Sequence, residues 1–521
     1  MLVRPPHVGQ TRANTYSQLY SLTHEIPCVK IILAVCALAL CLYYSLHDLY
    51  LIYICKFPPG PLSLPLIGGL HYLDPKRPHH SIRDLGAKYG GIFSLRMGPL
   101  GRVIFINDYK IIKQVCENKS SADRPHLPFI DILSSGASGI GSVEYGKKWK
   151  ILTKCFHTAL VKIASERGQS LVDKQLDFIM QRINAEGERP FDPREVISIS
   201  VLNCISGVAY GEMYNSADDE NLRKQYQNHW TIMRGLQSSN LINLFPFLWK
   251  LPTAFNTKVR EVLQMRDSFM SEKYIEHKKK PFMDNTEDLM DVILEVESSR
   301  KITNAKITIP DLFNSLWCLF LAGTDTFTDA ILWIFLYLMK NPKLQAEAQR
   351  EVDEAIREGN TFYPPREKLP YTEAFVLEVL RIVTPVHLGI PHYTSEDIEV
   401  GPYKIPKETQ FFPTLWTVHH SEENWPCPDR FDPTRFLSPD GELISKEKLS
   451  DMPFVPFGIG RRVCLGKTLV MELLVLIVSS FLKNYTIELP EGENPDMEGI
   501  ATLGLKSCPY KMVSRRRHLL L

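Results

Sequence analysis

The interpretation of this chain depends on one stretch, Phe457-Gly458-Ile459-Gly460-Arg461-Arg462-Val463-Cys464-Leu465-Gly466. Its cysteine lies between glycines and beside two arginines, directly before apolar residues spaced as on one helix face: Leu469, Val470, Leu473, Leu474, Ile477, Val478 and Phe481. Free main-chain N–H groups and the positive dipole end at a helix start stabilise a thiolate. We therefore expect the sulfur of Cys464 at the start of a helix, beside glycines that let a flat ligand approach closely.

A thiolate held in this way can be the axial ligand of a haem iron, whereas a buried, unligated cysteine is the ordinary alternative. Five positions fit the pattern F-x-x-G-x-R-x-C-x-G: Phe457, Gly460, Arg462, Cys464 and Gly466. The stretch thus resembles the haem loop of the cytochromes P450. The resemblance covers roughly residues 57–510 and implies a mainly α fold with small β-sheets. It also implies one N-terminal transmembrane helix, and haem b with Cys464 as the iron ligand.

Composition excludes several other classes of protein. The 521 residues include 60 Lys and Arg against 59 Asp and Glu, a balance that gives no sign of a nucleic-acid partner. Eleven cysteines are scattered without any C-x-x-C pair, which argues against zinc ribbons and thioredoxin-like redox sites. Their odd number and wide spacing favour reduced thiols that face the cytosol.

The N-terminal part carries an uncharged run over residues 31–46, which His47 and Asp48 interrupt. It predicts a membrane anchor over 31–55, with a cleaved signal peptide and a buried core helix as alternatives. We expect a flexible segment over 1–30, a stiff proline-rich hinge over 56–66 and a haem-thiolate catalytic domain over 67–521. Flanking charges do not fix the orientation. The resemblance implies the endoplasmic reticulum membrane with the catalytic domain in the cytosol.

A second motif, Ala322-Gly323-Thr324-Asp325-Thr326, interrupts a strongly apolar helix that we expect over 309–340. Gly, Thr and Asp lower helix stability there, and Thr can bond the carbonyl four residues back. The motif resembles the A-G-x-D/E-T oxygen-binding motif of the same family. This implies that Thr326 holds dioxygen and its proton, and that Asp325 supplies protons. A close packing contact between helices is the alternative.

Glu378 and Arg381 lie three residues apart, so they share one helix face. Alone such a pair is a common surface feature of little energetic value. Its place between the oxygen motif and the haem loop resembles the K helix of cytochromes P450. The resemblance implies a structural network of Glu378, Arg381 and Arg435 under the haem, with Arg430 as a rival third member.

The two anionic propionates of a haem need donors if they lie within protein. By resemblance these donors are Arg124, Trp149, His392 and Arg462. The family usually has an arginine four positions after this tryptophan, where Thr153 stands here. Either Lys154 replaces that arginine or one donor is missing.

Two further segments have readable patterns. Apolar alternation over 92–106 around Gly98-Pro99-Leu100-Gly101 predicts a β-hairpin. Residues 240–252 are apolar, and two prolines prevent a long helix. This segment is either simply buried or dips into a membrane near the place where lipophilic substrates enter.

Partners follow from what the chain contains and lacks. No G-x-G-x-x-G pattern opens a helix after a strand, so electrons must come from another protein. The resemblance implies NADPH–cytochrome P450 reductase, with cytochrome b5 as a further candidate. A basic cluster could dock an acidic donor, although a solvated face is the default interpretation; its members are Lys147, Lys148, Lys150 and Lys154.

These features predict a monooxygenase that inserts one atom of dioxygen into a lipophilic steroid, fatty acid or xenobiotic. Two alternatives remain: a haem-thiolate isomerase or dehydratase of peroxides, and a non-catalytic protein that binds haem or lipid. The first often lacks an acid and threonine pair, so Asp325 and Thr326 disfavour it.

Overall fold

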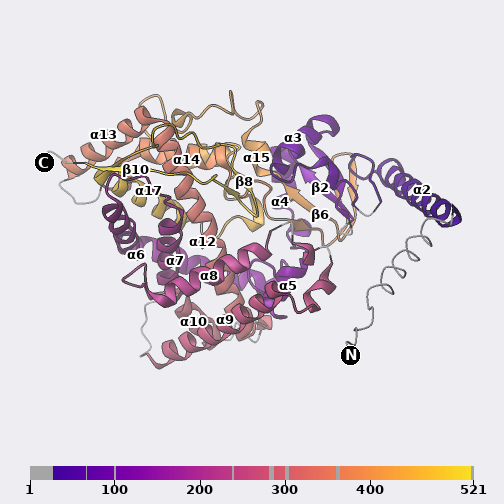
Figure 1. Ribbon diagram of the computed structural model, residues 1–521, viewed down its shortest axis with the longest axis horizontal. Coiled ribbons are helices and arrows are strands. Elements are labelled where there is room, and N and C mark those ends of the chain that lie inside the picture. Colours follow the sequence, from indigo (N-terminus) through magenta and orange to yellow (C-terminus); the bar gives the residue numbers. More distant parts are fainter. Residues whose placement is uncertain are drawn as a thin grey trace, which may run out of the picture.

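The computed structural model is mainly helical, with small sheets beside a helical body (Figure 1), which confirms the predicted fold class. The structure describes residues 27–65, 67–98, 101–237, 240–243, 245–280, 287–299, 304–359 and 364–517. The helices are α2 (Pro27–Leu49), α3 (Pro78–Tyr89), α4 (Tyr109–Glu117), α5 (Pro128–Ser134), α6 (Lys147–Glu186), α7 (Arg194–Tyr210), α8 (Glu220–Gly235), α9 (Ala254–Lys279), α10 (Leu289–Ser298), α12 (Ile309–Lys340), α13 (Pro342–Gly359), α14 (Pro370–Val383), α15 (Leu415–His419), α16 (Lys446–Asp451) and α17 (Lys467–Asn484). The strands are β1 (Ile92–Arg96), β2 (Arg102–Ile106), β3 (His392–Tyr393), β4 (Ile398–Val400), β5 (Tyr403–Ile405), β6 (Gln410–Pro413), β7 (Tyr485–Glu488), β8 (Ile500–Ala501), β9 (Leu505–Lys506) and β10 (Val513–Arg516).

Helix α12 lies in the middle of the body and spans the range predicted from its apolar pattern (Figure 1). Its start is fixed by a capping box, in which the Thr308 side chain accepts from the N–H of Asp311 and the Asp311 carboxylate accepts from the N–H of Thr308. Residues from Phe327 to Met339 are buried on every side, as expected of a core helix. Although α12 is long and apolar enough to span a membrane, its burial makes it part of the core.

The largest sheet brings distant parts of the chain together near the predicted haem donors. Strands β1 and β2 form the predicted hairpin, with Ile92 opposite Ile106, while the turn residues 99–100 lie outside the described residues. Strand β6 pairs with both β2 and β3, which gives the order β1-β2-β6-β3. A bridge between Asp123 and Tyr393 then sets Arg124 beside His392.

Helix α2 projects from the body next to the sheet (Figure 1), and most of its described apolar side chains are exposed. It begins at Pro27, within the range predicted to be flexible, while residues 1–26 lie outside the described part. Its last turn differs from a simple anchor, because Asp48 is buried against the sheet. The Oδ1 atom of Asp48 accepts from Arg102 Nε at 2.9 Å and from Arg96 Nη2 at 3.0 Å.

The described part of the proline-rich segment, residues 56–65, lies on strand β1. The hydroxyl of Ser94 donates to the carbonyl of Pro58 at 2.7 Å, and the N–H of Ser94 donates to the carbonyl of Pro59 at 2.7 Å. A Cβ on Gly60 would lie 1.8 Å from the Ser94 carbonyl oxygen, so only glycine permits this contact. The segment is therefore both stiff and fixed to the catalytic body.

Residues 240–252 form two short 3-10 turns, Leu241–Asn243 and Pro246–Lys250. Ile242 is buried, in a cluster that includes Phe129 and Val259. Phe247 is 63% exposed, and Leu241 and Leu251 are exposed as well. The segment is therefore partly buried, as the first alternative predicts, and partly exposed, as a contact with a membrane would require. Leu244 lies outside the described residues.

Candidate active site

Cys464 lies two residues before Gly466, the N-cap of α17, as its sequence context predicts. Burial raises the pKa of the Cys464 thiol, while the N–H groups of Gly466 and Lys467 and the Lys467 charge oppose that rise. The protein alone therefore favours a thiol at this position. A bound metal cation would supply the charge that converts it into a thiolate.

Two glycines of the loop, Gly458 and Gly460, have positive φ. Gly460 has φ +76°, and a Cβ there would lie 2.3 Å from the carbonyl oxygen of Cys116 at the end of α4. Gly458 has φ +73°, and a Cβ added there would meet no atom within 4 Å. Backbone conformation therefore requires both glycines, and close packing against α4 requires Gly460 as well. The expectation that the glycines of this loop admit a flat ligand stays a prediction.

The oxygen motif on α12 has two differently placed threonines. Thr326 Oγ1 donates to the carbonyl of Ala322 at 2.7 Å, and Thr324 Oγ1 donates to that of Phe320 at 2.8 Å. Thr324 is buried, whereas Thr326 and the small residues Ala322 and Gly323 retain accessible surface. One side of the helix is therefore open at Thr326, and that side can accommodate a ligand.

Asp325 lies in a buried charge network. Its Oδ1 atom is 2.7 Å from Lys506 Nζ of β9 and 4.0 Å from His229 Nε2 of α8. Burial alone would raise the pKa of Asp325, but His229 and Lys506 together hold it below its usual value. Asp325 is therefore a carboxylate at neutral pH. Sequence reasoning missed His229 and Lys506, because they lie far from Asp325 along the chain and belong to no motif.

Arg124 and Arg462 are two guanidinium groups near each other, and Asp123 is the acidic group that acts on Arg462. Arg124 donates to the carbonyl of Ile390 at 2.9 Å, and Arg462 donates to that of Ala122 at 2.7 Å. Burial, followed by the charge of Arg462, lowers the pKa of Arg124 to about 9; burial lowers that of Arg462 to about 10. Within the described ranges neither arginine forms an ion pair with a carboxylate. The two like charges would both be stabilised by an anion placed between them.

Trp149 and His392 lie beside these arginines. The guanidinium of Arg462 lies 4.8 Å from the centre of the Trp149 ring. His392 Nδ1 is 3.0 Å from the carbonyl oxygen of Ser121, and burial, followed by the charge of Arg124, lowers the His392 pKa well below its usual value. His392 is therefore neutral and presents its ring beside Arg124.

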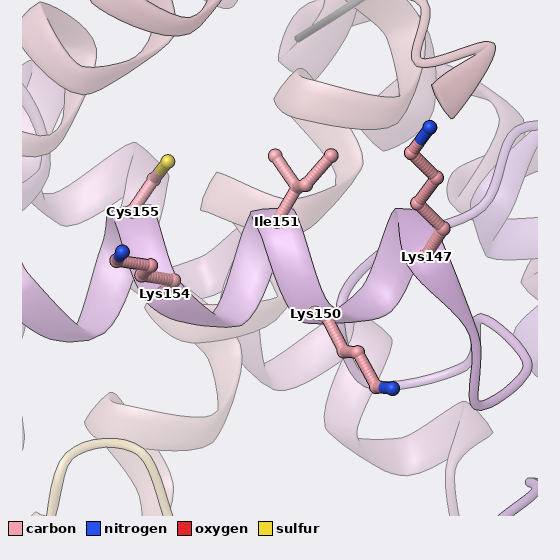
Figure 2. Close-up of a pocket in the computed structure, with 5 residues that line it drawn as sticks. All are labelled: Lys147, Lys150, Ile151, Lys154 and Cys155. Carbon is pink, nitrogen blue, oxygen red and sulfur yellow. The ribbon is translucent and has the colours of Figure 1, made fainter. Parts of the chain in front are cut away.

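The lysines at the start of α6 divide into two groups. Lys148 Nζ lies 2.6 Å from the Asp311 carboxylate, which removes it from the predicted basic cluster. Figure 2 shows the other three, Lys147, Lys150 and Lys154, around a hollow that Ile151 and Cys155 also line. Lys154 thus belongs to this exposed basic surface, and the structure gives no support for its use as a propionate donor in place of Thr153.

Glu378, Arg381 and Arg435 are in contact. Arg381 binds the Glu378 carboxylate through two nitrogens at 2.7 and 2.8 Å, with both side chains fully buried. Arg435 Nε lies 3.4 Å from Glu378 Oε1. The rival Arg430 is exposed and pairs instead with Asp432. This bidentate pair lies within α14 and orients the Glu378 carboxylate. The contact with Arg435, and the N–H of Asp432 that donates to Glu378 Oε1 at 2.8 Å, fix α14 relative to the segment that carries Arg435.

His419 extends this network toward the haem loop, and no sequence pattern marked it. Its carbonyl accepts from Arg381 Nη1 at 2.8 Å, and its Nδ1 atom lies 2.6 Å from Thr384 Oγ1. Its Nε2 atom accepts from the N–H of Val455 at 2.8 Å, two residues before the loop that begins at Phe457. His419 therefore connects Arg381, which binds its carbonyl, to the segment just before the Cys464 loop, which binds its ring.

The residues present fit a haem. Cys464 supplies a sulfur ligand, and Arg124 with Arg462 supplies a pair of cations for two propionates. The Cys464 residue retains accessible surface, and so does the apolar Ile390, which is 40% exposed. Apolar and thiol surface left open in a helical body is what a flat, largely apolar cofactor would cover.

Comparisons with known proteins agree with this site. The family model described as Cytochrome P450 matches residues 58–513. Cytochrome P450 2U1 of Rattus norvegicus is 31% identical over 492 residues, which cover 88% of this chain and 91% of that relative. Steroid 17-alpha-hydroxylase/17,20 lyase of Ictalurus punctatus is 31% identical over 475 residues, which cover 89% and 91%. Cytochrome P450 2U1 of Homo sapiens is 30% identical, with 88% and 89% covered.

The matched region contains the Cys464 loop, the α12 motif and the Glu378 network. By name these relatives are a cytochrome P450 and a steroid hydroxylase, and each shares nearly the full length of this chain. The chain therefore belongs to the cytochrome P450 family and is a monooxygenase.

Proposed function

We propose that this monooxygenase binds haem b through Cys464 and oxidises a lipophilic substrate at the open side of α12. When bound, the haem supplies the redox chemistry. Arg124 and Arg462 hold the propionates, with Trp149 and His392 beside them. Thr326 holds a proton at its Oγ1 atom, and the Asp325 carboxylate passes protons to it.

The observation that carries this proposal is the pairing of a cysteine at the start of α17 with two partly buried guanidinium groups that form no ion pair with any carboxylate of the described residues. We expect purified protein to show the red-shifted Soret band of a thiolate-ligated ferrous carbonyl haem. Cys464→Ser should abolish that band, whereas Cys427→Ser, which changes an exposed cysteine, should keep it. A wild-type holoprotein without the band, or a Cys464→Ser variant that retains it, would contradict the assignment.

The electron donor we propose is NADPH–cytochrome P450 reductase, with cytochrome b5 as a second acidic partner. The supporting feature is the exposed hollow of Lys147, Lys150 and Lys154 (Figure 2). Exposed charges of one sign steer an oppositely charged partner, and salt screens them. Reductase-dependent reduction should slow as ionic strength rises and should slow further in Lys150→Glu. A rate that is independent of salt would exclude this docking surface.

We also propose that α2 anchors the enzyme in the endoplasmic reticulum membrane with its catalytic body in the cytosol. By length and apolar composition the candidate span is Ala34–Ile54, within the predicted 31–55, but Asp48 is buried against the sheet by its ion pair with Arg102. We therefore propose that the spanning part ends before His47, earlier than predicted. Residues 27–46 then make a helix of about 30 Å, the thickness of a hydrocarbon core. Deletion of residues 1–46 should release much of the protein from membranes, and full retention would reject the anchor.

The substrate class we propose is lipophilic, as for a steroid, a fatty acid or a xenobiotic. Support comes from one relative, which is a steroid hydroxylase by name, and from the exposed apolar side chains of Phe247 and Leu251. A Soret-shift titration with progesterone, arachidonic acid and 7-ethoxycoumarin distinguishes the three classes. A polar compound that shifted the band while all three failed would exclude the lipophilic class.

A further inference from the structure

A second carboxyl lies one helical turn beyond Asp325. Asp329 is buried on α12, and residues three and four apart on a helix are neighbours. Asp329 is therefore adjacent both to Asp325 and to Thr326. Its nearest cation is Arg194 of α7, whose Nη1 atom lies 3.5 Å from Asp329 Oδ1.

The cation that pairs with Asp325 lies closer to its carboxylate than the cation that pairs with Asp329. Lys506 lies 2.7 Å from Asp325, whereas Arg194 is already engaged with Ser507, whose carbonyl and hydroxyl accept from its Nη2 atom at 2.7 and 2.8 Å. Asp329 thus has one long ion pair in a buried site. In the described part of the chain the charged groups that act on it are Asp325 of the same helix, Arg194 of α7 and Lys506 of β9, with His229 of α8 facing Asp325.

This arrangement shifts the pKa values of the two carboxyls in opposite directions. Burial, reinforced by the negative charge of Asp325, raises the pKa of Asp329 to about 7 against the opposing effects of Lys506 and Arg194. The pKa of Asp325 is shifted the other way. Near neutral pH the two carboxyls therefore hold one exchangeable proton between them, and Asp329 is the residue that carries it. A lone Asp325, already ionised, would hold no proton to give.

We propose that Asp329 stores the proton that Asp325 and Thr326 deliver. The O–H bond of the Asp329 carboxylic acid breaks and an O–H bond forms on the Asp325 carboxylate. Asp325 then gives this proton to the Thr326 hydroxyl oxygen as that hydroxyl gives its own proton to dioxygen, which is reduced at the open side of α12 with electrons from the reductase. Asp329 acts through these two residues and does not touch substrate. The inference rests on the proposed roles of Asp325 and Thr326.

Water returns the proton from the side of the pair on which Lys506 lies. The Lys506 side chain is 13% exposed, and its Nζ atom lies 4.4 Å from the centre of the Trp230 ring. Trp230 lines a hollow on the outer face of α8 together with Thr231 and Arg234. A proton from water at this hollow reaches the Asp325 carboxylate, and Asp325 passes it to Asp329, which restores the Asp329 carboxylic acid.

Infrared titration of the resting holoenzyme tests Asp329 without turnover. We expect a band of a buried protonated carboxyl that disappears as pH rises, with a midpoint near the Asp329 pKa of about 7. Asp329→Asn should remove it, and Asp291→Asn, which changes a carboxyl on α10 whose pKa burial also raises, should keep it. Asp325→Asn should move the midpoint to lower pH, because a negative neighbour is lost. A band that survives in Asp329→Asn overturns the inference.

Turnover with reductase separates this inference from the proposed function. With the probe that shifts the Soret band, product per NADPH should fall as pH rises through about 7, since Asp329 loses its proton. In Asp329→Asn that yield should be several-fold lower below pH 7 and should no longer vary with pH. A wild-type profile in Asp329→Asn rejects proton storage by Asp329. An unaltered yield in Thr326→Ala rejects instead the proposed role of Thr326, whatever the infrared titration shows.

Discussion

At the scale of single residues, two threonines of one motif have different environments. Thr324 and Thr326 each donate to the carbonyl four residues back, so each bends α12 in the same way. Thr324 is 2% exposed, but Thr326 lies on the open side of the helix. The hydroxyl that we propose to act at the haem is therefore that of Thr326, whereas both threonines contribute to the hydrogen bonding within α12.

This difference gives a matched pair of variants. Thr326→Ala should leave NADPH oxidation running while product per NADPH falls on the order of tenfold or more, because a positioned proton donor is lost. Thr324→Ala loses an equivalent main-chain bond and should stay within about twofold of wild type in the same assay. The yield is measured as product and hydrogen peroxide formed per NADPH. Equal losses in both variants would show that helix geometry, not the Thr326 hydroxyl, sets the yield.

At the scale of elements, the last turn of α2 is attached to the first sheet. Asp48 is fully buried, and so is the partner Arg102, which also donates to Ser94 Oγ at 2.7 Å and to the Pro61 carbonyl at 3.0 Å. The guanidinium of Arg102 thus contacts α2, β1 and the proline-rich segment at once. The orientation of the catalytic body relative to α2 is set by this charge pair and not by a free joint.

Breaking that pair should loosen the attachment. Asp48→Asn leaves Arg102 buried without its counter-ion, a change that typically costs about 3–5 kcal/mol. We expect faster tryptic cleavage after the exposed Lys56 in the folded enzyme. Asp84→Asn, on the exposed face of α3, is the control and should cleave at the wild-type rate. Identical cleavage rates for all three proteins would mean that the pair does not hold α2 in place.

At the scale of the whole molecule, a cluster of imidazoles joins α3, α15 and the segment after α14. The His79 ring lies 4.7 Å from that of Trp416 and 5.2 Å from that of His387, and His420 stacks on Trp416 at 3.8 Å. Both nitrogens of His387 lack a hydrogen-bond partner among the described groups. Burial lowers the pKa of His387 and of His420 to about 4, and that of His79 to about 2.

These histidines make the fold sensitive to acid. They are neutral in the folded protein and protonate near the ordinary value of 6.5 when unfolded. Their contribution to stability is complete above that pH and is lost as pH falls toward about 4, by about 1.4 kcal/mol for each pH unit and each histidine. Thermal unfolding between pH 7.5 and 5 should show this fall, and His387→Gln should reduce its slope. His126→Gln, at an exposed site, should not change the slope; an equal slope in His387→Gln would exclude this source of acid sensitivity.

Sequence alone determined those features whose cause is local. The helical spacing after Gly466 placed Cys464 at the start of α17, and the period of two over residues 92–106 predicted the hairpin. The contact of Glu378 with Arg381 followed from their separation of three residues on one helix. In each case the residues that interact lie within a few turns of each other, so a pattern in the chain is enough.

Tertiary structure alone decided which distant charges meet. Lys506 and His229 face Asp325 from β9 and α8, and Arg102 holds Asp48 across the sheet. The sequence pattern does not show which arginine, lysine or histidine will be buried, because most such residues lie on solvated surfaces. Only the packing of elements far apart in the chain buries these particular groups, and burial is what makes their charges strong enough to fix the anchor and to order the protons of the site.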